Sequence, residues 1–117
     1  MGVLPGEKKG ADNVTEEHRI QNEIREAVSP YCIIFRANVG CGRTIDGRYF
    51  STGLPKGFSD LFGVRIRDGR AVFIEVKAPN GRPSREQVHF IQQMRSLGAV
   101  AGICYSTEDA IKLIREE

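Results

Sequence analysis

The chain has 117 residues, 40% of them hydrophobic and 27% charged, so it is long enough for one domain and too short for two. No apolar run approaches the ~20 residues of a membrane-spanning helix, and residues 1–13 lack the apolar centre of a signal peptide. The three cysteines have no CxxC spacing, which argues against a disulfide framework or a zinc site and favours a reduced, cytoplasmic setting.

The net charge of +2 conceals a basic centre. Residues 36–85 contain ten Lys or Arg and four Asp or Glu, a balance of +6, whereas the two flanks together carry −4. An arginine-rich segment of this kind predicts a polyanionic partner such as nucleic acid. A solvated loop surface is the alternative interpretation.

The first half of the chain predicts a leader, a helix, a strand and a long loop. We expect residues 1–13 to be a flexible leader and residues 14–117 to form the domain. A helix should run from Thr15, its N-cap, to about Ser29, because Pro30 stops it. The run YCIIFRANV (31–39) predicts a strand, and the glycine-rich residues 40–57 predict a loop with a short hairpin around IDGRYF.

The second half predicts a hairpin, a helix, a strand and a last helix. Residues 60–67 and 70–77 flank an Asp-Gly pair, which is a strong hairpin signal. A helix should follow from Ser84 to Gly98, then a buried strand over 99–105 and a helix capped by Ser106 or Thr107. The order α-β-β-β-α-β-α predicts an α/β fold with a mixed sheet.

Three charged residues of the predicted hairpin lie at one end of it. With Asp68 and Gly69 as a two-residue turn, Asp60 would face Lys77, and Glu75 would share their side of the sheet. Two carboxylates without His or Cys suit Mg²⁺ or Mn²⁺, and the lysine could orient a water or stabilise charge on a phosphate. The alternative is an Asp60–Lys77 ion pair at a sheet edge, with Glu75 solvated.

Each of two helices also directs a polar residue inward from its first turn. Glu17 begins the stripe that continues with Ile20, Gln21 and Ile24. Gln87 begins a similar stripe on the second helix. Either residue alone could be a cap-region residue in contact with water, but together with the hairpin charges they indicate one convergent site.

The ordered motifs GFSD (57–60), EVK (75–77), GRPSREQ (81–87) and GAVAGICYSTEDA (98–110) resemble the VRR-NUC family of PD-(D/E)XK nucleases. The resemblance covers about residues 14–115. One departure is Ser59, which stands where the family pattern has proline before the aspartate.

The resemblance implies a restriction-endonuclease-like core and a set of site residues. Asp60, Glu75 and the Val76 carbonyl would hold Mg²⁺ or Mn²⁺, and Glu17 would assist at the metal. Lys77 would position the attacking water, with support from Gln87. Glu23 competes with Glu17 for the helical position but lies off the apolar stripe.

The resemblance further implies a metal-dependent, structure-selective DNA endonuclease, similar to phage-encoded Holliday-junction resolvases and acting as a homodimer in a bacterial cell. No membrane and no nucleotide cofactor are expected. The residues expected to contact DNA are Arg36, Arg43, Arg48, Lys56, Arg82 and Arg85. The alternatives are a nickase or exonuclease and a non-catalytic nucleic-acid-binding module on a nuclease fold.

Overall fold

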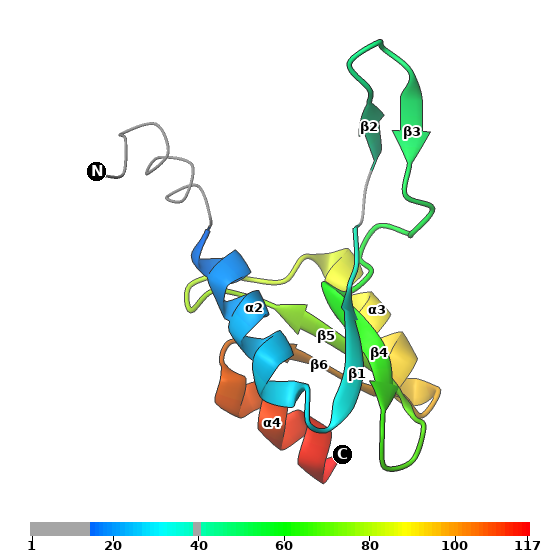
Figure 1. Cartoon of the computed structure of the whole chain (residues 1–117). Coiled ribbons are helices and arrows are strands. Elements are labelled where there is room, and N and C mark those ends of the chain that lie inside the picture. The colour runs from blue at the N-terminus through cyan, green and yellow to red at the C-terminus, as the bar shows by residue number, and fades with distance from the viewer. Residues whose placement is uncertain (1–14, 39–40) are drawn as a thin grey trace, which may run out of the picture.

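The computed structural model describes residues 15–38 and 41–117, so the expected leader lies outside the described residues. A four-stranded sheet with the order β1-β4-β5-β6 forms the centre of the molecule. Helices α2 and α4 cover one face of this sheet and α3 lies on the other (Figure 1). A second, two-stranded sheet of β2 and β3 projects from the body as an arm, a name used here for residues 41–51.

Each helix begins at a residue whose side chain caps it. The helices are α2 (Glu16–Val28), α3 (Arg85–Ser96) and α4 (Thr107–Glu116). Their N-caps are Thr15, Ser84 and Ser106, and each side-chain oxygen accepts a backbone N–H three residues further on. The three expected helices are therefore confirmed, and Ser106 rather than Thr107 caps the last one.

The strands make the predicted mixed sheet. They are β1 (Cys32–Arg36), β4 (Leu61–Arg65), β5 (Ala71–Val76) and β6 (Val100–Cys104). The pairs β1–β4 and β4–β5 are antiparallel, while β5 and β6 are parallel and joined through α3. This arrangement confirms the α/β fold with an antiparallel hairpin and is consistent with a restriction-endonuclease-like core.

The register of the β4–β5 hairpin differs from the predicted one. Leu61 faces Ile74, so continuing the ladder by one residue places Asp60 opposite Glu75 rather than Lys77. The N–H of Arg65 donates to the Arg70 carbonyl at 2.8 Å, which leaves four residues in the turn instead of two. The longer turn moves the register by two residues, so the same side chains stay on the same face.

Arg65 explains the longer turn. Its side chain is only 2% exposed, and its Nη2 lies 2.7 Å from Asp68 Oδ2. Its Nη1 donates to the Ile114 carbonyl at 2.6 Å, which ties the turn to α4. A buried guanidinium needs these partners, and the four-residue turn supplies the carboxylate.

The two faces of the sheet pack differently. The face under α2 and α4 forms an aliphatic core of Ile20, Ile24, Val28, Leu61, Val72, Ile74, Val76, Val100, Ala110 and Ile114, with Cys32 and Cys104. The opposite face carries a chain of aromatic contacts through Phe35, Phe62, Phe58, Phe73 and Phe90. Because Phe90 belongs to α3, these rings fix that helix on the sheet.

The arm consists of β2 (Cys41–Arg43) and β3 (Tyr49–Ser51), paired antiparallel. Three residues, Ile45 to Gly47, form the turn, and Gly47 has φ +88°, a conformation that favours glycine. The short hairpin expected inside residues 40–57 is therefore confirmed.

Candidate active site

A cleft of about 520 Å³ opens at the end of the sheet where β4 begins and β5 ends. Its wall includes Glu17 from α2, Asp60 from the start of β4 and Gln87 from the first turn of α3. Three residues that are far apart in the sequence therefore meet at one depression. This convergence is the kind of concave polar site at which ligands bind.

Asp60 and Glu75 lie on facing positions beside this cleft. Asp60 Oδ2 accepts the N–H of Val76 at 2.9 Å, which fixes the orientation of the carboxylate. Glu75 is 1% exposed, and within the described part of the chain neither of its buried carboxylate oxygens has a hydrogen-bond partner. A buried carboxylate in this state is costly unless a bound cation or a proton compensates it.

The pKa of Glu75 also indicates that a cation or a proton compensates its buried carboxylate. Burial, with a smaller contribution from the neighbouring Asp60 carboxylate, raises the pKa of Glu75 to about 8, and Lys77 opposes the shift. In the absence of another cation the Glu75 carboxyl therefore keeps its proton near neutral pH. A strongly perturbed carboxyl beside a cleft is typical of functional sites.

Lys77 lies between two carboxylates. Its Nζ is 3.5 Å from Glu75 Oε2 and 3.9 Å from Glu17 Oε2, and its side chain is 13% exposed. The alternative of a solvated Glu75 beside an Asp60–Lys77 edge pair does not match this geometry, because Glu75 is buried and is itself the closer partner of Lys77.

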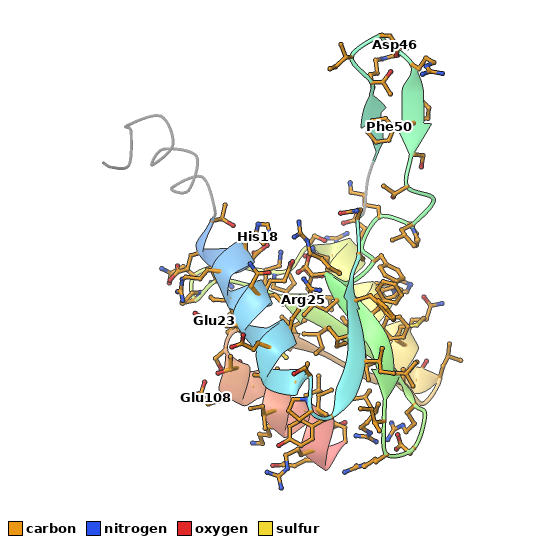
Figure 2. All side chains as sticks on the ribbon, viewed as in Figure 1. His18, Glu23, Arg25, Asp46, Phe50 and Glu108 are labelled. Carbon is orange, nitrogen blue, oxygen red and sulfur yellow. The ribbon has the colours of Figure 1, made fainter. Side chains whose placement is uncertain are left out.

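The two helical candidates occupy different situations. Glu17 lines the cleft, whereas its competitor Glu23 lies on the outer side of α2 and pairs with Arg19 at 2.7 Å (Figure 2). Gln87 also lines the cleft, and its Oε1 accepts the Ser84 N–H at 2.8 Å in a capping box. The Gln87 side-chain oxygen thus caps the N-terminus of α3, and its NH₂ group can donate a hydrogen bond to a ligand in the cleft.

The donor set fits one hard divalent cation. Among residues 15–38 and 41–117 no three His, Cys, Asp or Glu side chains gather as a metal-binding group. Two carboxylates are nevertheless adjacent at Asp60 and Glu75, and Val76 turns its N–H toward Asp60. Because a strand residue directs its amide and carbonyl to the same side, the Val76 carbonyl faces this edge too. Carboxylate oxygens such as those of Glu75, which accept no hydrogen bond from the described residues, and a carbonyl oxygen are ligands for Mg²⁺ or Mn²⁺.

The six basic residues expected to contact DNA lie in three parts of the structure. Arg36 and Lys56 line the cleft, with Lys56 Nζ 3.8 Å from Glu86 Oε2. Arg43 and Arg48 lie on the arm. Arg82 and Arg85 are exposed in the segment that leads into α3 and in its first residue.

Sequence reasoning placed Gln21 on the stripe that begins at Glu17 but did not assign it to the site. Its side chain lines the cleft, is 8% exposed and has an Oε1 without a hydrogen-bond partner among the described residues. The available signal was its spacing, since a residue four positions after Glu17 lies on the same side of the helix.

Comparison with known proteins identifies the family. The VRR-NUC domain family matches residues 37–108. This chain belongs to the VRR-NUC family. A solved structure titled "VRR_NUC domain" is 25% identical, with a TM-score of 0.60, and the match covers 87% of this chain and 97% of that one. No curated protein matches the chain.

Membership in the VRR-NUC family makes the chain a nuclease-type protein with DNA as the implied substrate. The matched segment contains Asp60, Glu75, Val76, Lys77 and Gln87, whereas Glu17 precedes it. In the described part of the VRR-NUC chain, no helix is long and apolar enough to cross a membrane.

Proposed function

We propose that this VRR-NUC domain is a divalent-metal-dependent endonuclease that hydrolyses phosphodiester bonds in branched DNA, as a homodimer similar to Holliday-junction resolvases. The observation that carries the proposal is the buried Glu75 carboxylate. Among the described residues its two oxygens have no hydrogen-bond partner, and it lies beside Asp60, which lines the cleft, and 3.5 Å from the Lys77 ammonium group.

Asp60, Glu75 and the Val76 carbonyl would hold one Mg²⁺ or Mn²⁺, with Glu17 nearby on the cleft wall. A bound divalent cation supplies Lewis-acid chemistry, since it polarises a phosphoryl oxygen and lowers the pKa of a water. The chain contributes orientation, because the Val76 N–H holds the Asp60 carboxylate in place before any ligand arrives.

Lys77 positions the attacking water and stabilises charge on the phosphate. Glu75 and Glu17 restrain its ammonium group, which has three donors and can satisfy both carboxylates and one further acceptor. The capping bond to Ser84 fixes Gln87, so that its NH₂ can donate to the same water or to a phosphate oxygen.

DNA binding rests on the basic residues around the cleft. Arg36 and Lys56 contact phosphates next to the scissile bond, and Arg82 and Arg85 extend this contact along α3. Arg43 and Arg48 contact the backbone further away. Charge reversal at Arg43 and Arg48 should weaken binding, most visibly at higher salt, because phosphate contacts depend on ion release.

An exposed apolar surface supports the homodimer. Ile33, Phe35 and Val64 are 56%, 51% and 43% exposed, and they share the face of β1 and β4 that α3 leaves uncovered. Contiguous apolar surface of this kind is typical of protein–protein contacts. Two copies related by a two-fold axis would present two active sites to a symmetric four-way junction.

A cleavage assay tests the proposal. Labelled four-way junction, flap, plain duplex and single strand are each incubated with Mn²⁺, Mg²⁺ or EDTA. The wild-type protein is compared with Asp60→Ala and with Glu23→Ala, which removes a carboxylate from the outer side of α2. We expect metal-dependent cuts placed symmetrically in the junction, absent with Asp60→Ala and retained with Glu23→Ala.

Other outcomes separate the alternatives. Cuts confined to ends or to one strand of ordinary duplex would identify an exonuclease or a nickase. Junction binding without cleavage under any metal would identify a binding module, and Asp60, Glu75 and Lys77 would then be a structural cluster. Sedimentation of the protein at several concentrations tests the homodimer separately.

A further inference from the structure

The tip of the arm presents an aliphatic side chain to solvent. Ile45 is fully exposed, at the first position of the three-residue turn between β2 and β3. Figure 2 shows the neighbouring Asp46 at the outer end of the arm. A large apolar residue at the far end of a projection contributes nothing to the core, and with the exposed rings of Tyr49 and Phe50 it gives the arm several exposed apolar side chains, the kind of surface that binds a partner.

Hydrogen bonds hold this tip in one shape. The Thr44 N–H donates to the Arg48 carbonyl at 2.8 Å, and the Thr44 hydroxyl donates to the Asp46 carboxylate. Arg43 donates to the Gly47 carbonyl at 3.0 Å, and Arg48 Nε lies 3.1 Å from Asp46 Oδ2. Ile45 is therefore displayed on an ordered turn, which lowers the entropy cost of binding.

The arm also carries exposed aromatic rings. Tyr49 and Phe50 are 65% and 47% exposed, and the Phe50 ring lies over Gly42 on the paired strand. Rings exposed beside arginines are the usual platform for nucleic-acid bases, since every base has a face that stacks.

Both ends of the arm connect to the cleft. The segment before it contributes Arg36, Ala37 and Asn38 to the cleft wall, and the segment after it contributes Lys56, Gly57 and Phe58. A DNA backbone that reaches Asp60 must therefore pass the base of the arm. Within the arm the two positive charges of Arg43 and Arg48 exceed the one negative charge of Asp46, which favours a polyanion over a second copy of this chain as the partner.

We infer that the arm is a wedge that inserts Ile45 between neighbouring bases at an interruption of the DNA stack, with Tyr49 and Phe50 available to stack on a released base. The inference rests on the proposed function and adds the feature of the substrate that is recognised. Apolar side chains inserted into base steps are a known means of kinking DNA.

The wedge would select branched DNA because of the cost of unstacking. Separating two stacked pairs in continuous duplex costs more than one aliphatic side chain recovers on burial. At a branch point, a flap base or a nick, the stack is already interrupted and this cost is small. The same side chain therefore discriminates in favour of interrupted DNA without reading its sequence.

The test uses a four-way junction and a plain duplex that carry 2-aminopurine at the branch point and at the matching central position. Binding and fluorescence are measured in a Lys77→Ala background, which prevents cutting. Ile45→Ser removes the wedge. Ile66→Ser is the matched control, since Ile66 is 59% exposed in the β4–β5 turn, at the end of the body opposite the arm.

We expect junction binding to raise the 2-aminopurine fluorescence with the Ile45 protein and with Ile66→Ser, and to leave it unchanged with Ile45→Ser. Ile45→Ser should also weaken junction binding by about tenfold and duplex binding much less. Equal fluorescence and affinity for both serine variants would overturn the wedge while leaving the nuclease intact. Absence of any DNA binding by the wild-type chain would overturn the proposed function itself. A sedimentation change caused by Ile45→Ser in the free protein would show that the arm contacts a second copy instead.

Discussion

Replacement of Glu75 by glutamine should stabilise the metal-free protein. Glu75 is 1% exposed, its carboxylate oxygens lack hydrogen-bond partners within the described residues, and Asp60 lies beside it. Glutamine has nearly the same shape and cannot ionise. The variant should therefore lose the proposed metal ligand together with the free-energy cost that burial imposes on this carboxyl group, a trade that is common at active sites.

The pH dependence gives the size of the effect. Burial raises the pKa of Glu75 from 4.5 to about 8, so between these values the folded state binds more protons than the unfolded state. Stability from this group is therefore unaffected below about pH 4.5, falls as the pH rises and reaches its minimum above about pH 8. Each pH unit between 4.5 and the pH of the measurement costs the wild-type protein about 1.4 kcal/mol of stability. At pH 7, Glu75→Gln should therefore be more stable than wild type by up to about 3 kcal/mol.

The assay is urea unfolding in EDTA, followed by circular dichroism at pH 5, 7 and 8.5. The gain of Glu75→Gln over wild type should grow with pH. Glu23→Gln is the control: it makes the same chemical change at an exposed residue paired with Arg19, where the expected effect is below about 1 kcal/mol at every pH. A Glu75→Gln protein that is no more stable than wild type at pH 8.5 would refute the reasoning.

Three further changes test other parts of the structure. Lys77→Ala should abolish cleavage while junction affinity, measured by fluorescence anisotropy, stays within about threefold. Because Arg65 lowers the pKa of Asp68 to about 2, the stabilisation from this pair is present above about pH 4 and lost as the pH falls toward 2; Asp68→Asn should remove that acid dependence in unfolding titrations. In Gly63→Ala the new Cβ would overlap the Ile33 carbonyl oxygen on β1, so urea unfolding should show a loss of at least about 3 kcal/mol, and an unchanged midpoint would contradict the close approach of the two strands.

The helices could be predicted because their signals are local. Thr15, Ser84 and Ser106 each cap the turn that follows them, and the capping box of Gln87 lies three residues from Ser84. A cap acts within its own first turn, so sequence spacing is enough to locate it.

The hairpin register could not be predicted because it depends on a distant contact. Asp-Gly alone favours a two-residue turn. The actual turn has four residues because Arg65 needs both Asp68 and the Ile114 carbonyl, and Ile114 lies 49 positions further along the chain. The same face was nevertheless predicted for Asp60, Glu75 and Lys77, since a shift of two residues preserves the alternation.

The burial of Glu75 also could not be predicted from the sequence. At the end of a strand the exposure of a side chain depends on what covers it, and here Phe90 and its neighbours hold α3 on that face of the sheet. The glycines and charges of residues 40–57 indicated a long functional loop. They did not indicate that part of it would form a paired ribbon directed away from the body.

The attachment of the arm would make the proposed recognition and the proposed hydrolysis separable. Among the side chains that the structure describes, none from residues 42–57 belongs to the aliphatic core. The C-terminal connection of the arm depends on Gly57, which has φ +92° and whose Cβ position lies 2.6 Å from the Glu86 carbonyl oxygen, so any side chain there would displace α3. The arm precedes Gly57 in the chain, and its length and its side chains can differ at little cost to the stability of the body. If the proposed function holds, the domain offers a constant body for hydrolysis, and β-ribbons suited to different DNA shapes could be grafted between Asn38 and Gly57.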